Sequence, residues 1–392
     1  TIEELNTVFN NTEGNREKKG KGKEYVRRTA ARALGPGRRR RGAGRRRGVV
    51  ARTDRSLLPD DVGSFRRLEL EALRGRLAVQ GQVAEVDQGF LPQGVLQGGT
   101  YFVSCTGGYQ HASPIVHADF DQKLRDMENL DIGKSVLSHG MPGPELLGGS
   151  EADDWASRIN DHLAEVVQTH PGKFEAFATL GWGSSERTIA EIDRCVKQLG
   201  FKGVYLFSNI NQKTLDSKEF WPVYKHIESL GVAMNMHPTA PINMNGIDHR
   251  PLVPGMAFMF DTTLATARMV MSGLFEEYPD LKLIVPHTGG FVPFIRGRVG
   301  RMIDAWTSPD DWADLSESSQ ASFDKIYVDT VAHSPEALEY CLKVYGADKL
   351  LYGTDHPFSH FELFNEMVDN LACSDADREL ISHGNAERLL EL

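Results

Sequence analysis

From about residue 100 to the C-terminus, short apolar runs rich in β-branched and aromatic residues alternate with longer segments of helical period. This alternation is typical of repeated strand–helix units around a parallel sheet. It predicts seven strands, at Ile132–Ser138, Phe174–Leu180, Gly203–Ser208, Val232–His237, Leu281–His287, Ile326–Asp329 and Leu350–Asp355. The intervening segments have helical spacing. Trp155, Ile159 and Leu163 share one apolar stripe, and Ser334 before Pro335 is typical of a helix N-terminus.

Seven such units fit an α/β fold of the (β/α)8 TIM-like barrel type better than a doubly wound sheet, provided that one more strand lies upstream. The first strand is weak or missing in the pattern. We expect it in or before residues 80–105, with Tyr101–Cys105 as the best local candidate. The predicted organisation is an irregular segment over residues 1–100 and the barrel over residues 101–392.

The charge is unevenly distributed along the chain, whose net charge is −10. Residues 1–100 carry 21 Lys and Arg against 12 Asp and Glu, so the remainder carries −19. Arg27–Arg76 holds 16 arginines, and no lysine lies between Lys23 and Lys123. Three interpretations of this Arg-rich segment stay open: translation in another frame or an unrelated fused start, a disordered tail, or a nucleic-acid-binding arm. The acidic remainder argues against nucleic-acid binding by the barrel.

The composition also bears on location. No run approaches the roughly 18 apolar residues that span a bilayer, and the N-terminus has no apolar signal segment. The four cysteines have no ligand-like or disulfide-framework spacing. We therefore expect reduced thiols, no membrane partner and a cytoplasmic location.

Polar residues follow three of the predicted strands. His237 ends the fifth strand of the expected barrel, His287 the sixth, and Asp355 the eighth. The active site of such a barrel lies at the C-terminal ends of its strands, so these side chains should converge there. Imidazole and carboxylate are the ligands of a catalytic Zn²⁺ or similar ion. The sequence thus predicts a metal site.

The motifs around these residues resemble a known family. His-Pro after one strand, His-x-Gly-Gly-x-x-Pro-Phe after the next and Gly-Thr-Asp-x-Pro-Phe after the last are similar to the amidohydrolase-2 branch of the amidohydrolase superfamily. The group that includes aminocarboxymuconate semialdehyde decarboxylase and related aromatic-acid decarboxylases is most similar. The resemblance covers about residues 114–392 and includes the ending Gly-Asn-Ala-x-Arg-Leu.

The resemblance implies roles for individual residues. It makes His237 and Asp355 metal ligands, and His287 and Asp355 the catalytic pair that handles the proton. Arg298 would reach a substrate carboxylate, in some relatives across a dimer interface. Lys123 stands where the decarboxylases have a carboxylate-binding arginine, which keeps the charge but loses the bidentate fork.

One departure concerns the metal. The family carries a His-x-His pair at the end of its first strand, and this chain has none. The nearest approximation, His117-Ala118-Asp119, is explained more simply by a helix-capping aspartate and a surface histidine.

The resemblance therefore implies one divalent ion, Zn²⁺ first and Mn²⁺ second, a small carboxylic acid as substrate, and a homodimer. The expected activity is non-oxidative decarboxylation of an aromatic or unsaturated acid. Two alternatives stay open: hydrolysis of a lactone, ester or amide, and an inactive barrel that acts as a binding protein.

Overall fold

The computed structural model describes the backbone of residues 76–83, 95–97, 100–104 and 110–114. It describes backbone and side chains of residues 119–247, 251–305, 315–358 and 361–392. By contacts, all described residues belong to one unit, Leu68–Leu392. That unit starts before residue 101, where the barrel was expected to begin. The predictions for the Arg-rich segment lie almost wholly outside the described residues.

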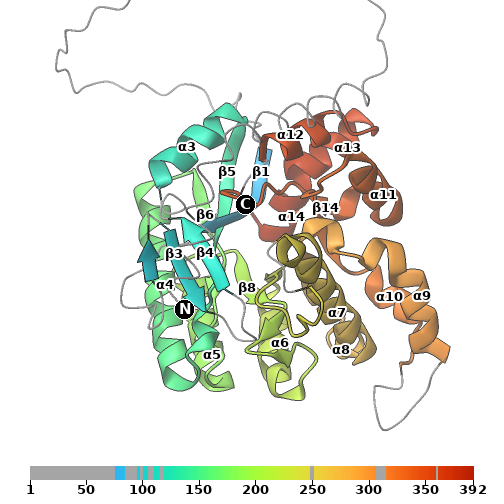
Figure 1. Ribbon diagram of the computed structural model, residues 1–392, viewed down its shortest axis with the longest axis horizontal. Coiled ribbons are helices and arrows are strands. Elements are labelled where there is room, and N and C mark those ends of the chain that lie inside the picture. The colour runs from blue at the N-terminus through green and yellow to red at the C-terminus, as the bar shows by residue number, and fades with distance from the viewer. Residues whose placement is uncertain are drawn as a thin grey trace, which may run out of the picture. The chain divides into compact units, whose positions relative to one another are not determined.

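In the described part of the chain, eight parallel strands form the central sheet (Figure 1). In chain order they are β1 (Arg76–Val83), β5 (Ile132–His139), β6 (Phe174–Ala176) continued by β7 (Ala178–Thr179), β8 (Gly203–Phe207), β11 (Ala233–His237), β12 (Lys282–Val285), β13 (Tyr327–Asp329) and β14 (Leu350–Leu351). They pair in that order, as β1-β5-β6 and β7-β8-β11-β12-β13-β14. Between β6 and β7 the Phe177 N–H donates to the Leu137 carbonyl at 2.9 Å. All seven predicted strands are confirmed.

The first strand is present, contrary to the prediction that it is weak or missing. β1 pairs in parallel with β5, with register shifts at Arg76/Leu77 and Ala78/Gly81. The favoured candidate, Tyr101–Cys105, was wrong. Thr100–Ser104 forms β3, which pairs antiparallel with β2 (Val95–Gln97) and β4 (Gln110–Pro114) in a separate sheet. The backbone N–H and C=O groups along the edge of the buried strand β5 need hydrogen-bond partners, and β1 supplies them. In the sequence, the glycine and the two glutamines of β1 hide its apolar pattern.

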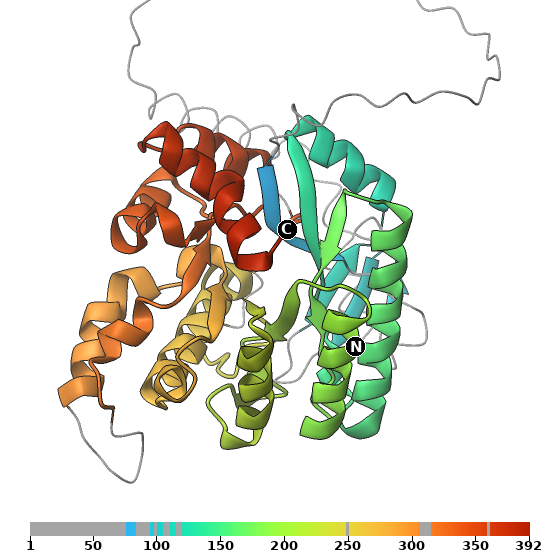
Figure 2. The ribbon, with the colours of Figure 1, turned by 180° about the vertical axis from the view of Figure 1, so that it is seen from behind.

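The C-terminal segment occupies the gap between the last and the first strand. Among the described residues no ladder joins β14 to β1. Instead the Tyr352 N–H donates to the Ile381 carbonyl at 3.0 Å, and Asn385 Nδ2 donates to the Leu350 carbonyl at 2.7 Å. The residues from Leu380 onward contact both β1 and β14, and Figure 2 shows this segment beside β1. The Gly-Asn-Ala ending thus satisfies backbone groups at the open edge.

The helices follow one another around the outside of the strands in chain order (Figures 1 and 2). They are α3 (Phe120–Asn129), α4 (Gly149–Thr169), α5 (Ser185–Lys197), α6 (Trp221–Leu230), α7 (Phe258–Met271), α8 (Leu274–Glu277), α9 (Val292–Ala305), α10 (Ser319–Phe323), α11 (Pro335–Tyr345), α12 (Phe361–Asp369), α13 (Asp375–Glu379) and α14 (Asn385–Leu390). Short turns of 3-10 or π helix are η4 (Pro144–Leu146), η5 (Lys218–Phe220), η6 (Val253–Ala257), η7 (His287–Gly289), η8 (Ala347–Lys349) and η9 (Leu380–Gly384), and a small hairpin is formed by β9 (Asn209–Ile210) and β10 (Lys213–Thr214). Ser334 caps α11 as predicted, since its side chain accepts from the Ala337 N–H. None of the helices described has both the length and the apolar character to cross a membrane.

The core has two layers, because successive strand residues point to opposite faces. Leu137, Val204 and Met234 belong to the layer between strands and helices. Their neighbours Val136, Tyr205 and Ala233 belong to a second cluster on the inner face of the strands. Side chains therefore fill the interior of the barrel. The residue that ends each strand supplies the chemical group at the mouth of the barrel.

Candidate metal centre

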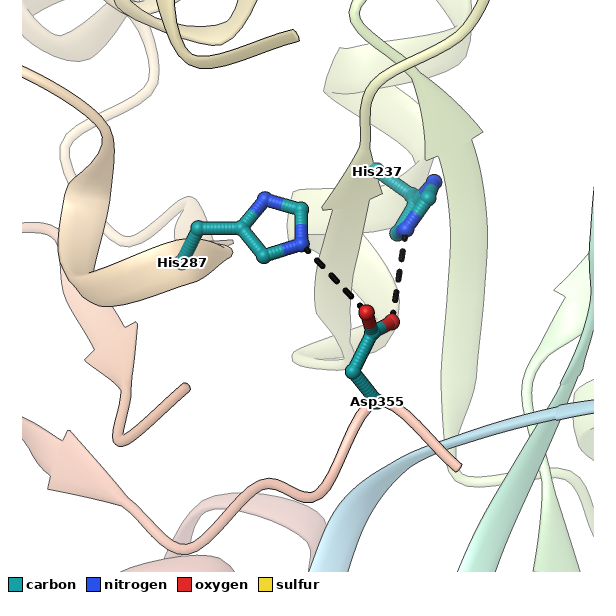
Figure 3. A group of neighbouring side chains, drawn as sticks. All are labelled: His237, His287 and Asp355. Atoms are coloured by element: carbon teal, nitrogen blue, oxygen red, sulfur yellow. Dashed lines mark ion pairs between the residues drawn. The ribbon is translucent and has the colours of Figure 1, made fainter. Parts of the chain in front are cut away.

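His237, His287 and Asp355 meet at the C-terminal ends of three strands. His237 is the last residue of β11, His287 begins η7 directly after β12, and Asp355 lies just beyond β14. Figure 3 shows the two imidazoles pointing at the carboxylate of Asp355 from different sides. The structure thus brings together the three residues that strand ends singled out in the sequence.

The spacing of these side chains suits a shared ion. His237 Nε2 lies 3.8 Å from Asp355 Oδ1, and His287 Nε2 lies 3.9 Å from Asp355 Oδ2. One ligand atom from each residue lies within 4.8 Å of the others. Side-chain exposures are 7%, 12% and 19% for His237, His287 and Asp355. An ion with bonds of about 2 Å would fit between atoms at this separation.

The hydrogen bonds of the group also fit a metal. His237 Nδ1 lies 2.7 Å from the Pro238 carbonyl, so Nδ1–H donates there and the Nε2 lone pair faces Asp355. A metal-binding histidine is commonly oriented in this way. Asp355 Oδ1 is buried and has no hydrogen-bond partner among the described residues. A cation would satisfy this oxygen.

The backbone that presents the group is strained. His287, Thr288 and Asp355 have φ values of 53°, 55° and 51°, in the left-handed region that disfavours side chains. The buried carboxylate of Asp329 stabilises the first turn by accepting the Thr288 N–H at 2.8 Å and the Val331 N–H at 3.1 Å. Such strain persists where the surrounding structure fixes it, which is common at functional sites.

Burial and neighbouring charges shift the pKa values of the three side chains in different directions. Burial lowers the pKa of His237, and the charge of Asp355 opposes this only in part. Burial also acts to lower the pKa of His287, but Asp355 and Asp329 outweigh it and raise that pKa. Burial alone would raise the pKa of Asp355, but the neighbouring imidazoles of His237 and His287 outweigh it and hold this pKa below the usual range. Asp355 is thus ionised at neutral pH, as a ligand for a cation must be.

Lys123 lies in a buried hydrogen-bonded chain beside this group. On α3 it is 5% exposed, and its Nζ lies 3.2 Å from Nδ1 of His356, the residue that follows Asp355. His356 Nε2 lies 2.9 Å from Asp126 Oδ2, so His356 donates to this carboxylate and accepts from Lys123. By contrast, Arg298 is exposed on α9. In the single chain, only one of the two predicted carboxylate-binding residues lies next to the metal group.

Burial lowers the pKa of Lys123 to about 7, despite the opposing charge of Asp126. The native state then releases this proton near pH 7, whereas the unfolded chain keeps it to about 10.5. Because the unfolded state binds more protons in between, the free energy of unfolding of wild type relative to Lys123→Met should rise with pH, by about 1.4 kcal/mol per unit from pH 7 to 10. Urea unfolding of both proteins measures this difference.

Lys134→Met is the matched control, because Lys134 on β5 is 29% exposed and pairs with Glu175. The difference in free energy of unfolding between wild type and Lys134→Met should be the same at every pH in this range. A flat difference for Lys123→Met as well would show that the buried amine does not titrate there.

Sequence reasoning missed several polar groups around the site. Asp126 and Asp329 support it, and Glu145 and Tyr205 lie buried at the same end of the barrel. Asp329 ends a predicted strand, so the rule that selected His237 could have found it. His117 lies outside the described residues, while Asp119 caps α3 by accepting the Gln122 N–H, as expected.

Comparisons with known proteins agree with this class of barrel and site. The amidohydrolase family model matches residues 123–392. The chain is 32% identical to 2-amino-3-carboxymuconate-6-semialdehyde decarboxylase of Dictyostelium discoideum, over 70% of this chain and 77% of that protein. It is 30% identical to gamma-resorcylate decarboxylase of a Polaromonas species, over 69% and 87%.

Among solved structures, 5-carboxyvanillate decarboxylase of Novosphingobium aromaticivorans, complexed with manganese and 4-hydroxy-3-methoxy-5-nitrobenzoic acid, is 26% identical. It aligns with a TM-score of 0.63, over 69% of this chain and 80% of that one. The strands, the helices around them and the residues at the strand ends define an enzyme barrel of the (β/α)8 class. The chain belongs to the amidohydrolase family, which confirms the resemblance drawn from its motifs.

Proposed function

We propose that this protein is a divalent-metal-dependent, non-oxidative decarboxylase of an aromatic or unsaturated carboxylic acid. The observation that carries the proposal is the convergence of His237, His287 and Asp355 within 4.8 Å. The relatives reported above support decarboxylation over hydrolysis, although the same three residues would serve a hydrolase.

His237 and Asp355 would hold the ion, while His287 beside them would handle the proton. The described strand β1 reads RLAVQGQV and contains no histidine. A divalent ion bound here would supply positive charge for the substrate carboxylate and a neighbouring oxygen. Manganese in a similar solved structure supports Mn²⁺, whereas Zn²⁺ stays a prediction from the ligand types.

The chain's own groups would manage the proton. His287 Nε2 and Asp355 Oδ2, 3.9 Å apart, are placed to hold a proton and deliver it to the carbon that bears the carboxylate. The carbon–carbon bond to the carboxylate then breaks, and its electron pair restores the double bond or the aromaticity of the ring as carbon dioxide leaves. Below about pH 7, where its amine is protonated, Lys123 contributes positive charge beside Asp355 through His356, and thereby favours an anionic substrate.

We also propose that the protein forms a homodimer. Three apolar side chains are exposed near the start of α7 and α9: Met256 at 47%, Phe260 at 48% and Phe294 at 82%. These two helices pack together, and Arg298 is on the same α9. A second copy would cover this apolar surface. The cytoplasmic location stays a prediction.

The test is metal-dependent release of carbon dioxide. Dialysed protein should bind about one Mn²⁺ or Zn²⁺ per chain by elemental analysis. The loaded protein should release ¹³C-labelled carbon dioxide from gamma-resorcylate, 5-carboxyvanillate or 2-amino-3-carboxymuconate semialdehyde. A chelator should stop the release and added Mn²⁺ restore it. Protein that binds no metal and releases no carbon dioxide would overturn the proposal.

A further inference from the structure

The Glu145 carboxyl group is buried, and the proposed reaction does not use it. Glu145 lies in η4, in the loop that follows β5, and is 3% exposed. Neither carboxyl oxygen accepts a hydrogen bond from another described residue. Burial raises its pKa to about 8. An unpartnered buried carboxyl group lowers stability, so its presence at the mouth of a barrel calls for an explanation.

The loop is built to turn this carboxyl group inward. A Cβ atom at Gly143 would lie 2.0 Å from Glu145 Oε2 and 2.2 Å from Cε2 of Phe207. Both atoms thus crowd the same point, and only a glycine leaves room for them. The carboxyl group therefore lies against the ring of Phe207, the last residue of β8, and not in solvent.

Tyr205 connects Glu145 to the metal group through its ring contacts. The Tyr205 ring meets the edge of Phe207, the ring against which Glu145 lies, with centroids 5.3 Å apart. The Tyr205 ring stacks on the imidazole of His237, with ring centroids 6.1 Å apart. The Ser138 hydroxyl of β5 lies beside the Tyr205 hydroxyl. Polar groups from β5, η4 and β8 thus adjoin the metal group on one side.

We propose that Glu145 and Tyr205 form a second subsite, which binds a hydroxyl substituent of the substrate. This inference rests on the proposed function, because it assumes that the substrate carboxylate lies at the metal group. A phenolic or enolic O–H would donate to the unpartnered Glu145 carboxyl group, while Phe207 offers an apolar face to the ring or diene. A site that provides a buried acceptor discriminates against analogues that lack the donor. Glu145 is therefore a specificity-determining residue for hydroxylated acids.

The experiment compares three ligands by calorimetry on the Mn²⁺-loaded full chain: benzoate, 2,6-dihydroxybenzoate and resorcinol. Wild type should bind 2,6-dihydroxybenzoate at least tenfold more tightly than benzoate. Glu145→Met, which keeps the length but removes both oxygens, should reduce this ratio to less than about threefold. Manganese content and benzoate affinity should not change. The matched control is Glu151→Met, because Glu151 is exposed at the start of α4.

A second readout separates a binding role from a structural one. Without ligand, the melting temperature of Glu145→Met should rise by about 2 °C or more, because an unpartnered buried carboxyl group is lost. A fall in melting temperature would show that the carboxyl group holds the fold, and would contradict the subsite. If Glu145→Met does not fold, Glu145→Gln is compared on the same ligands, with a smaller loss of preference expected and an unchanged preference contradicting the subsite.

The ligand set separates the two hypotheses. If Glu145→Met keeps the tenfold preference, the subsite is overturned while the proposed function stands. If neither acid binds wild type but resorcinol does, and the variant loses resorcinol, the subsite stands and the carboxylic acid substrate is wrong. Equal resorcinol affinity for both proteins overturns the subsite. If wild type binds none of the three, both proposals fail.

Discussion

Replacing His237 with alanine is expected to remove the metal from this protein and, with it, the release of carbon dioxide. His237 Nε2 is one of three ligand atoms within 4.8 Å. Structural zinc sites with four ligands bind with about 10–16 kcal/mol, so one ligand contributes on the order of 3 kcal/mol. That is about a hundredfold in affinity. Elemental analysis after dialysis should find about one ion per chain in wild type and almost none in His237→Ala.

The control for this variant is His226→Ala. His226 lies on α6, the helix that leads into β11, but its Nε2 lies 2.8 Å from Asp193 on the outer helix layer. It should keep its metal and lose at most about 1 kcal/mol of stability. If His237→Ala retains the wild-type metal content, the ion binds elsewhere, and the group at the strand ends is not the metal centre.

The strands and the metal group could be predicted because each has a recognisable local pattern in the sequence. β8 and β11 are buried along their whole length, so β8 is a continuous apolar run and β11 is interrupted only by Asn235 before it ends at His237. His237 and Asp355 then stand out because a polar residue interrupts such a run where a barrel strand ends. Asp119 was predictable as a helix cap for another local reason, its place at the start of a helix.

The elements that were missed depend on contacts between distant parts of the chain. β1 carries Gln80, Gly81 and Gln82, and becomes a strand through its pairing with β5 rather than through its own pattern. The chain from Lys123 to Asp126 passes through His356, which is 233 positions from Lys123. Glu145 becomes unusual only when its burial and its lack of a partner are known. No local spacing encodes such relationships.

The site therefore has two kinds of residue with opposite energetic roles. The metal group and Glu145 place polar side chains where the fold gains little stability from them, on strained backbone or without partners among the described residues. Other buried polar residues offset this by fixing the strand ends. Asp261 of α7 is the clearest of these, since it is 2% exposed and joins the end of β8 to the segment after His237.

Replacing Asp261 with alanine is expected to lower both stability and metal affinity. Its carboxylate accepts from Ser208 Oγ at 2.5 Å, from Asn209 Nδ2 at 3.0 Å and from the Ile242 N–H at 3.0 Å. The variant would leave these buried donors without their acceptor, which costs about 3–5 kcal/mol in total. Urea unfolding of wild type and variant measures this loss.

The effect on the metal follows from the same contacts. Ser208 Oγ also accepts the Thr239 N–H at 3.3 Å, two residues after His237, so loosening Ser208 frees the segment that orients His237. Metal affinity should fall by about 10- to 100-fold, as it does when groups that orient a ligand are removed. Asp280→Ala, at an exposed aspartate before β12, should change neither quantity. A variant at Asp261 that loses stability but binds metal as wild type does would show that β11 alone orients His237, without help from the loop that follows it.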